Sequence, residues 1–217
     1  ASYFNYAGNG PSAVRAFLLT GTDLGSDVTV TPSTNFEVSL VRASGYNSSA
    51  ITSLLADAAA GDSIYIRLKA GLTPNSYNES ITISATNANT RTVSVSGTVT
   101  PLITTSASSI PGVTYAGNGP SIERTIDISG SNLTGDITLT PPADFEISLT
   151  SGSGFTLSPI VLTRSGSVVN NTTIYVRMKS GLTIGSYTGE NIVCSSASAT
   201  TRNIGCSGTV TAHPAIS

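Results

Sequence analysis

Apolar and polar residues alternate with a period of two along several short stretches of the chain. Between positions 64 and 69 the order is Ile-Tyr-Ile-Arg-Leu-Lys, and the stretch 36–40 reads Phe-Glu-Val-Ser-Leu. This period is typical of β-strands that bury one face. Clusters of Gly, Asn, Asp, Ser and Pro separate the stretches at intervals of about 8–12 residues. The pattern therefore predicts an all-β fold.

The chain also repeats itself. The segment Tyr-Ala-Gly-Asn-Gly-Pro-Ser at 6–12 recurs unchanged at 115–121, and the stretch 64–69 returns at 174–179. Ser-Gly-Thr-Val-Thr closes both copies, at 96–100 and at 207–211. A unit of about 100 residues has the size of an independent domain rather than of a solenoid repeat. We predict two domains, 1–100 and 101–211, followed at 212–217 by a tail or the start of a further repeat.

The two copies differ at their beginnings. The segment 101–105, Pro-Leu-Ile-Thr-Thr, has the pattern of a first strand for the second copy, and the first copy holds little of it before its Tyr-Ala-Gly segment. We therefore expect the chain to be a piece of a longer array. Residues 54–60 favour a helix through their alanines, but the run ends at Gly61, and the second copy has Ser and Val there. We expect a loop at this position.

About seven strands in roughly 100 residues are typical of an immunoglobulin-like or fibronectin III-like β-sandwich. Tyr77 and Tyr187 support this fold, because each follows a Gly-Leu-Thr turn and precedes the penultimate predicted strand. Their position resembles a tyrosine corner, in which the phenol binds upstream backbone. We expect both residues to be structural. The predicted architecture is two tandem sandwiches of this kind.

Composition removes several classes of function. Of the 217 residues only 10% are charged, with ten Lys and Arg and a net charge of −2. These numbers leave no basic stripe for nucleic acid. No apolar run reaches the roughly 18–20 residues of a membrane helix. The one histidine, His213, excludes a His-based catalytic triad and a site with several His ligands. The acids that recur in both copies are scattered, so we expect no enzyme and no catalytic residue: Asp27/Asp136, Glu37/Glu146 and Glu79/Glu190.

The polar side of one predicted strand carries the candidate binding residues, which are Tyr65, Arg67 and Lys69 and their copies Tyr175, Arg177 and Lys179. One interpretation is structural, with cross-strand ion pairs from Glu37 to Arg67 and from Glu146 to Arg177. The other is a ligand face for a surface glycan or a protein, in which the rings stack and the cations bind acidic groups. The sequence leaves both interpretations open.

Two further sites rest on short spacings. Cys194 and Cys206 fall on the last two predicted strands, and a hairpin centred near Thr200 would set them opposite each other. They form either a disulfide or two small core residues, as Ile83 and Val95 do in the first copy. The second candidate is a structural calcium site. Its ligands would come from two pairs of acids that are near each other in the sequence, Asp23 with Asp27 and Asp57 with Asp62. No other cofactor or metal is expected.

The repeated motifs resemble a known family. Gly-x-Gly-Pro-Ser, Phe-Glu-Ile-Ser, Ile-Tyr-Val-Arg-x-Lys, Gly-Ser-Tyr and Ser-Gly-Thr-Val-Thr are similar to the Ig-like repeats of large secreted and cell-surface, adhesin-type proteins of Bacteroidota. The resemblance spans nearly all of both copies. It implies a β-sandwich, an extracellular or cell-surface location and no catalytic residues. It also implies a candidate O-glycosylation acceptor at Ser63, within Asp-Ser-Ile.

These features predict a non-catalytic structural or adhesion repeat pair that acts as a stalk or spacer of a larger cell-surface protein. The alternative is a carbohydrate- or protein-binding accessory module. The expected partners are neighbouring repeats of the same polypeptide and a surface glycan or protein.

Overall fold

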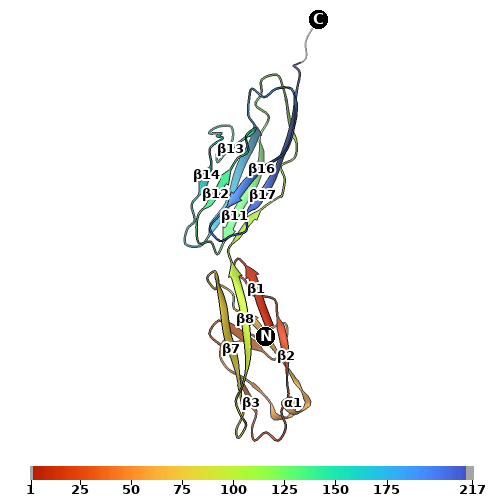
Figure 1. Ribbon diagram of the computed structural model, residues 1–217, viewed down its shortest axis with the longest axis vertical. Helices are drawn as coiled ribbons and strands as arrows, with labels where there is room; N and C mark the ends of the chain where they lie inside the picture. Colours follow the sequence, from red (N-terminus) through yellow and green to blue (C-terminus); the bar gives the residue numbers. More distant parts are fainter. Residues whose placement is uncertain (1, 214–217) are drawn as a thin grey trace. The chain divides into compact units, whose positions relative to one another are not determined.

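The computed structural model describes residues 2–213, and the chain divides into two compact units at Thr100 and Pro101. Each unit consists of two β-sheets that face each other across an apolar core (Figure 1). The predicted all-β class and the tandem immunoglobulin-like sandwiches are therefore confirmed. Most of the predicted start of a further copy, 214–217, lies outside the described residues.

The first unit pairs a five-stranded sheet with a three-stranded one. Strand β1 runs parallel to β8, and the other neighbours are antiparallel. The five-stranded sheet has the order β1 (Ser2–Ala7), β8 (Arg91–Thr100), β7 (Asn75–Ser84), β3 (Val28–Thr31) and β5 (Ile51–Ser53). The three-stranded sheet has the order β2 (Arg15–Leu19), β6 (Asp62–Leu68) and β4 (Phe36–Ser39).

The second unit repeats this arrangement with one strand more. Its five-stranded sheet has the order β10 (Val113–Ala116), β17 (Arg202–Thr211), β16 (Gly185–Ser195), β12 (Ile137–Thr140) and β14 (Ile160–Leu162). Its other sheet has four strands, β13 (Phe145–Ser148), β15 (Val169–Met178), β11 (Arg124–Ser131) and β9 (Leu102–Thr105). Strand β9 is the predicted first strand of the second copy, and it pairs antiparallel to β11.

The alternation seen in the sequence decides which side chains enter the core. Along β6, Ile64, Ile66 and Leu68 are buried, whereas Tyr65 and Arg67 between them lie on the outer side. The ring of Phe36 on β4 meets Phe4 on β1 edge to face, with centroids 5.4 Å apart. Because β1 and β4 belong to different sheets, this contact joins the two sheets of the first unit. Buried aromatic rings contribute a large part of the hydrophobic stabilisation of a small domain.

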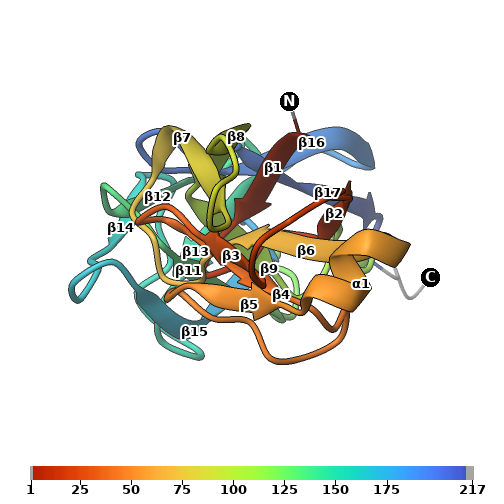
Figure 2. The same cartoon turned by 90° about the horizontal axis from the view of Figure 1, so that it is seen from below.

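One prediction about the first unit is wrong. Residues Leu55–Ala60 form a short helix, α1, rather than a loop, and α1 lies beside β6 (Figure 2). Two contacts hold it: the side chain of Ala58 is fully buried, and the carboxylate of Asp27 accepts a hydrogen bond of 2.9 Å from the amide of Leu55. An acidic group near the first helical amides satisfies a donor that has no partner within the helix. These tertiary contacts stabilise a helix that is too short to be stable alone.

Candidate functional site

The predicted binding residues of each unit lie on the outer side of one central strand. Tyr65 and Arg67 on β6, and Lys69 directly after it, are half-buried and alternate with core residues. Tyr175, Arg177 and Lys179 occupy the same places on and after β15. The structure therefore brings each trio to one sheet face.

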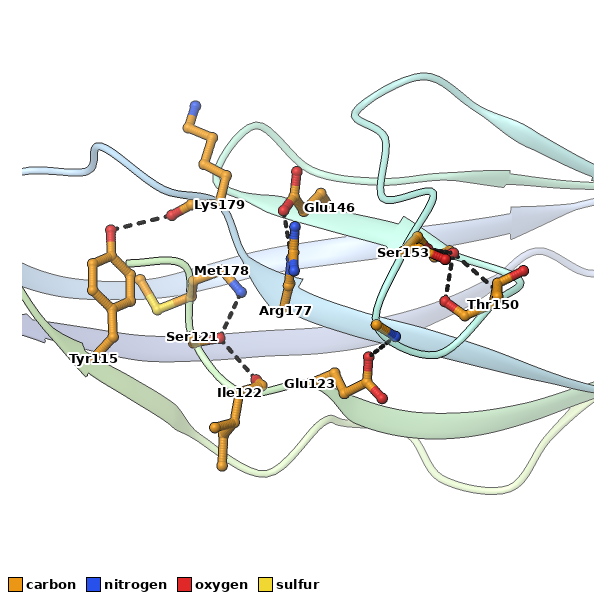
Figure 3. Close-up of polar contacts among 12 residues, drawn as sticks. Tyr115, Ser121, Ile122, Glu123, Glu146, Thr150, Ser153, Arg177, Met178 and Lys179 are labelled. Carbon is orange, nitrogen blue, oxygen red and sulfur yellow. Dashed lines mark hydrogen bonds and ion pairs between the residues drawn. The ribbon is translucent and has the colours of Figure 1, made fainter. Parts of the chain in front are cut away.

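The two arginines are held within their own units. Nε of Arg67 lies 2.6 Å from Oε1 of Glu37, and its guanidinium stacks 3.9 Å from the ring centroid of Tyr46. Arg177 repeats both contacts, with Glu146 at 2.6 Å and the ring of Phe155 at 3.8 Å (Figure 3 shows the ion pair). The predicted cross-strand ion pairs are confirmed by the strand register. An arginine that is paired on one side and stacked on another is less free for a ligand.

The two stacking rings, Tyr46 and Phe155, are not apparent from the alternation of the strands. Tyr46 and Phe155 are 109 positions apart, and each follows a glycine with positive φ, Gly45 at 72° and Gly154 at 70°. An aromatic residue after a repeated glycine was the signal that could have identified them. Glycine allows this left-handed backbone without strain, so the loop can fold back over the arginine.

Each lysine forms a hydrogen bond with the loop that precedes the neighbouring strand, which is β4 in the first unit and β13 in the second. Nζ of Lys69 donates to the carbonyl oxygen of Thr34, and Nζ of Lys179 donates to that of Ala143 at 2.8 Å. Lys179 also lies 3.3 Å from Oδ1 of Asp144. Both lysine side chains thus make structural contacts of the same kind as the arginines.

The surroundings of the tyrosines differ between the units. Tyr65 borders a shallow depression whose other walls are Val14, Arg15, Ala16 and Arg42. In the second unit, Glu123 stands at the position of Val14 and Ser151 at that of Arg42. There Glu123 accepts hydrogen bonds from the Ser151 hydroxyl and, at 2.9 Å, from the Gly152 amide. The first unit therefore presents a cationic depression that the second unit replaces with an internal loop contact.

The two corner tyrosines bind backbone as the structural hypothesis requires. The Tyr77 hydroxyl donates to the carbonyl oxygen of Thr73 at 2.7 Å, and the Tyr187 hydroxyl donates to that of Thr183 at 2.8 Å. Each bond spans the turn that leads into the penultimate strand, so it holds the entry of that strand.

The repeated Tyr-Ala-Gly-Asn-Gly-Pro-Ser segment is a structural clamp. Tyr115 donates its hydroxyl to the carbonyl oxygen of Lys179 at 3.1 Å (Figure 3). The amide of Leu182 donates to the same hydroxyl. Tyr6 makes the equivalent bonds in the first unit. Gly119, at φ +66°, lies so close over the Tyr115 ring that an added Cβ would collide with it. The glycine is needed for both its φ and its size.

One pair of repeated acids has different electrostatics in the two units. Glu79 accepts hydrogen bonds from the amide and the side chain of Asn35. Burial raises the pKa of Glu79, but the Ser33 hydroxyl, the two Asn35 bonds and Lys69 together outweigh burial, so its pKa lies below the usual value. At the matching position of Asn35 the second unit has Asp144. Burial raises the pKa of Glu190, and the neighbouring carboxyl of Asp144 raises it further.

The cysteines do not form the predicted opposed pair. Cys194 lies opposite Arg202 and Cys206 opposite Glu190, because the hairpin turns near Ser198 rather than near Thr200. Both are free thiols in the core, and burial raises the pKa of each to about 11. They fill the places of Ile83 and Val95, in agreement with the core alternative.

The acids considered for calcium are spread over separate contacts. Asp27 binds the start of α1, and Oδ2 of Asp62 accepts a hydrogen bond of 2.7 Å from the Ser53 hydroxyl. Within residues 2–213, no three His, Cys, Asp or Glu side chains are placed to share a metal ion.

Ser63, the candidate glycosylation acceptor, lies half-buried on β6 opposite Leu18. Across the described residues, 2–213, no helix is long and apolar enough to cross a membrane.

Comparisons with known proteins give distant structural matches. Neither protein-family models nor curated proteins give a match to this sequence. Among solved structures, similarity extends to the CooA pilin subunit from enterotoxigenic Escherichia coli, at 16% identity over 52% of this chain and 99% of that chain, with a TM-score of 0.34. The CsuC–CsuE chaperone–tip adhesion subunit complex of Acinetobacter baumannii Csu pili matches at 11% identity over 93% and 97%, with a TM-score of 0.44. The DIP-gamma IG1+IG2 structure matches at 12% identity over 98% and 97%, with a TM-score of 0.32.

At these identities and TM-scores the matches carry no argument about activity or partners. The sheets themselves define the class of protein: a tandem pair of immunoglobulin-like β-sandwich domains.

Proposed function

We propose that this chain is a non-catalytic structural repeat pair that serves as a spacer or stalk in a larger extracellular or cell-surface protein. Its neighbours in that role are further repeats of the same polypeptide. The resemblance to adhesin-type repeats of Bacteroidota supports the location. The proposal rests mainly on how the first and last strands of the first unit are paired.

In each unit the last strand runs parallel to the strand that holds the Tyr-Ala-Gly motif. That strand begins the first unit, whereas β9 precedes it in the second unit. In the first unit Ser2 lies opposite Val95 and Ala7 opposite Thr100, so the chain enters at one end of this ladder and leaves at the other. In the second unit β10 and β17 pair in the same sense, from Val113 opposite Gly208 to Ala116 opposite Thr211. A pull on the two ends of the first unit slides β1 and β8 along each other. The ladder hydrogen bonds are then loaded together rather than one at a time.

The repeated polar residues support the same role. The phenol of Tyr6 and the guanidinium of Arg67 contact other groups of the first unit, and Tyr115 and Arg177 do the same in the second. These residues have structural contacts that account for their presence in both copies.

Single-molecule force spectroscopy tests the spacer function. The first unit should resist a higher force when pulled from residues 1 and 100 than from cysteines placed at Asn9 and Thr100. The second geometry peels β1 from β8 at one end, and the buried native thiols leave the introduced ones as the reactive handles. Equal rupture forces in the two geometries would contradict the proposal.

A second function is favoured by the depression beside Tyr65. We propose that Arg15, Arg42 and Tyr65 bind an acidic surface glycan or an acidic loop of a protein, because two cations and an aromatic ring line the same depression. Nε of Arg15 donates to the carbonyl oxygen of Tyr3 at 2.9 Å, so its terminal nitrogens are the groups that would bind the ligand. The test is binding to acidic glycans and acidic peptides by calorimetry. Arg42→Ala and Tyr65→Ala should abolish binding, whereas Tyr175→Ala in the second unit should leave it unchanged. Equal loss with Tyr175→Ala, or no binding by the unmodified protein, would exclude this function.

A further inference from the structure

The first unit contains an apolar groove that its sister unit covers with a strand. The groove has a volume of about 270 Å³ and lies between the end of β2, the loop after it and the β7–β8 hairpin. Four of its lining residues are half-buried, whereas their counterparts in the second unit are at most 2% exposed. The lining residues and their counterparts are Phe17 and Ile126, Leu24 and Leu133, Ile83 and Cys194, and Val93 and Ile204.

The covering element in the second unit is the segment that contains β9. Ile103 on β9 is 1% exposed and Ile110 is 4% exposed, and both belong to the core of that unit. Nε of Arg202 donates a hydrogen bond of 3.1 Å to the carbonyl oxygen of Ile103. The residue that matches Arg202 in the first unit is Arg91, and Arg91 lines the groove.

The backbone beside the groove also differs between the units, because the strand next to it is paired in the second unit and is an edge strand in the first. Strand β9 pairs with β11 from Leu102 opposite Ser131 to Thr105 opposite Ile128. Strand β2, the counterpart of β11, is the edge strand of its sheet within residues 2–100, with β6 as its neighbour there. β2 also ends at Leu19, whereas β11 continues through the positions that pair with β9. An unpaired edge next to an apolar groove is the arrangement that accepts an added strand.

We propose that this groove is a strand-acceptor site, occupied by the linker strand of a neighbouring repeat of the same type. The occupant is an extended segment with the pattern of residues 101–110, Pro-Leu-Ile-Thr-Thr-Ser-Ala-Ser-Ser-Ile. It pairs antiparallel to β2, its first isoleucine fills the space between Leu24 and Val93, and Arg91 binds the carbonyl oxygen of that isoleucine. Repeats of this type would thereby be joined by a strand that completes the next sandwich. The occupant rests on the proposed function, which supplies the neighbouring repeat, but strand binding and resistance to force are measured separately and can fail independently.

The test uses the full chain and a synthetic peptide of residues 101–110. We expect binding of one peptide per chain, with slowed amide exchange at Leu18 and Thr20, the counterparts of Asp127 and Ser129, and chemical-shift changes at Arg91 and Val93. A control peptide with Ile103→Asp should not bind. Arg91→Ala should weaken binding by about three- to tenfold, the usual effect of one lost hydrogen bond.

Fusing the strand segment to the chain makes the test independent of the affinity of the free peptide. Since the offset between the copies is 109 at this point, residues 101–109 placed directly before Ala1 reach the groove in the register of β9. We expect this extension to raise the unfolding temperature of the first unit, and the same extension with Ile103→Asp not to do so. The proposal is overturned if neither peptide nor extension changes the first unit, or if the Ile103→Asp controls act equally.

Discussion

The amide of Asp144 donates a hydrogen bond of 3.2 Å to Oε2 of Glu190, which brings two carboxyl groups together on the second unit. In the first unit Asn35 takes the place of Asp144, and both its backbone amide and its neutral side-chain amide donate hydrogen bonds to Glu79. This difference, together with Pro142 at the position of Ser33, accompanies the opposite pKa shifts of the repeated glutamates.

Replacing Asp144 by asparagine should make the second unit behave like the first. The pKa of Glu190 should fall, because a neighbouring negative charge is removed and an amide donor takes its place. At pH 7 we expect the free energy of unfolding of this unit to rise by at most about 1 kcal/mol, since the site is partly exposed and the contact of Asp144 with Lys179 is lost. Urea unfolding and NMR titration of Glu190 measure both effects. The reciprocal change Asn35→Asp should raise the pKa of Glu79 and destabilise the first unit.

The two units should also respond oppositely to mild acid through these glutamates. Glu79 has a lowered pKa, so its stabilising contribution is present above its unfolded value of about 4.5 and is lost as the pH falls further. Glu190 has a raised pKa, so its ionisation costs stability above its folded pKa and that cost disappears toward and below pH 4.5. Between pH 7 and pH 4, Glu79→Gln should flatten the acid destabilisation of the first unit. Glu190→Gln should stabilise the second unit at pH 7 but not at pH 4. The same effect of Glu190→Gln at both pH values would contradict the assignment.

Arg177→Lys should destabilise the second unit by about 1 kcal/mol. Lysine keeps the charge but loses the planar stacking on Phe155 and the directed bond from Nε to Glu146. Chemical denaturation provides the measurement, and Arg67→Lys should have the same effect on the first unit through Tyr46. A substitution without effect would mean that the ring contact adds nothing to the surface ion pair.

Gly97→Ala should destabilise the first unit by about 2 kcal/mol or more, because a Cβ there would lie 2.6 Å from the carbonyl oxygen of Phe4. The parallel strand β1 can approach β8 this closely only where no side chain stands between them. Gly112→Ala is the matched control, since its nearest contact would be an ordinary 3.6 Å and its φ is not positive. Thermal unfolding that shows equal losses for the two variants would refute the close-approach explanation.

Both cysteines should behave as buried thiols. Burial raises the pKa of Cys194 and Cys206 to about 11, so little thiolate forms at neutral pH and the core excludes thiol reagents. We expect no labelling in the folded protein, labelling of two thiols per chain in denaturant, and no change in intact mass on reduction. A mass increase of two hydrogens would show a disulfide and contradict the register of the hairpin.

Much of the sandwich could be predicted from local pattern. The alternation along 64–69 correctly separates core residues from outer ones, because successive side chains of a strand point to opposite faces. The repeat of Glu37 and Arg67 as Glu146 and Arg177 identified cross-strand partners. The rings that stack on these arginines come from a distant loop, so the strand pattern could not reveal them.

The amino-acid sequence by itself determined the fold class, the duplication and the side of each strand that enters the core, since these depend on side-chain polarity and period alone. Only the tertiary structure decided the register of the last hairpin, which separates Cys194 from Cys206, and the helix at Leu55–Ala60, which needs Asp27 and the burial of Ala58. It also decided which apolar residues of the first unit line an open groove. Register, short helices and edge pairing depend on contacts between residues far apart in the chain, and a local pattern contains no information about those contacts.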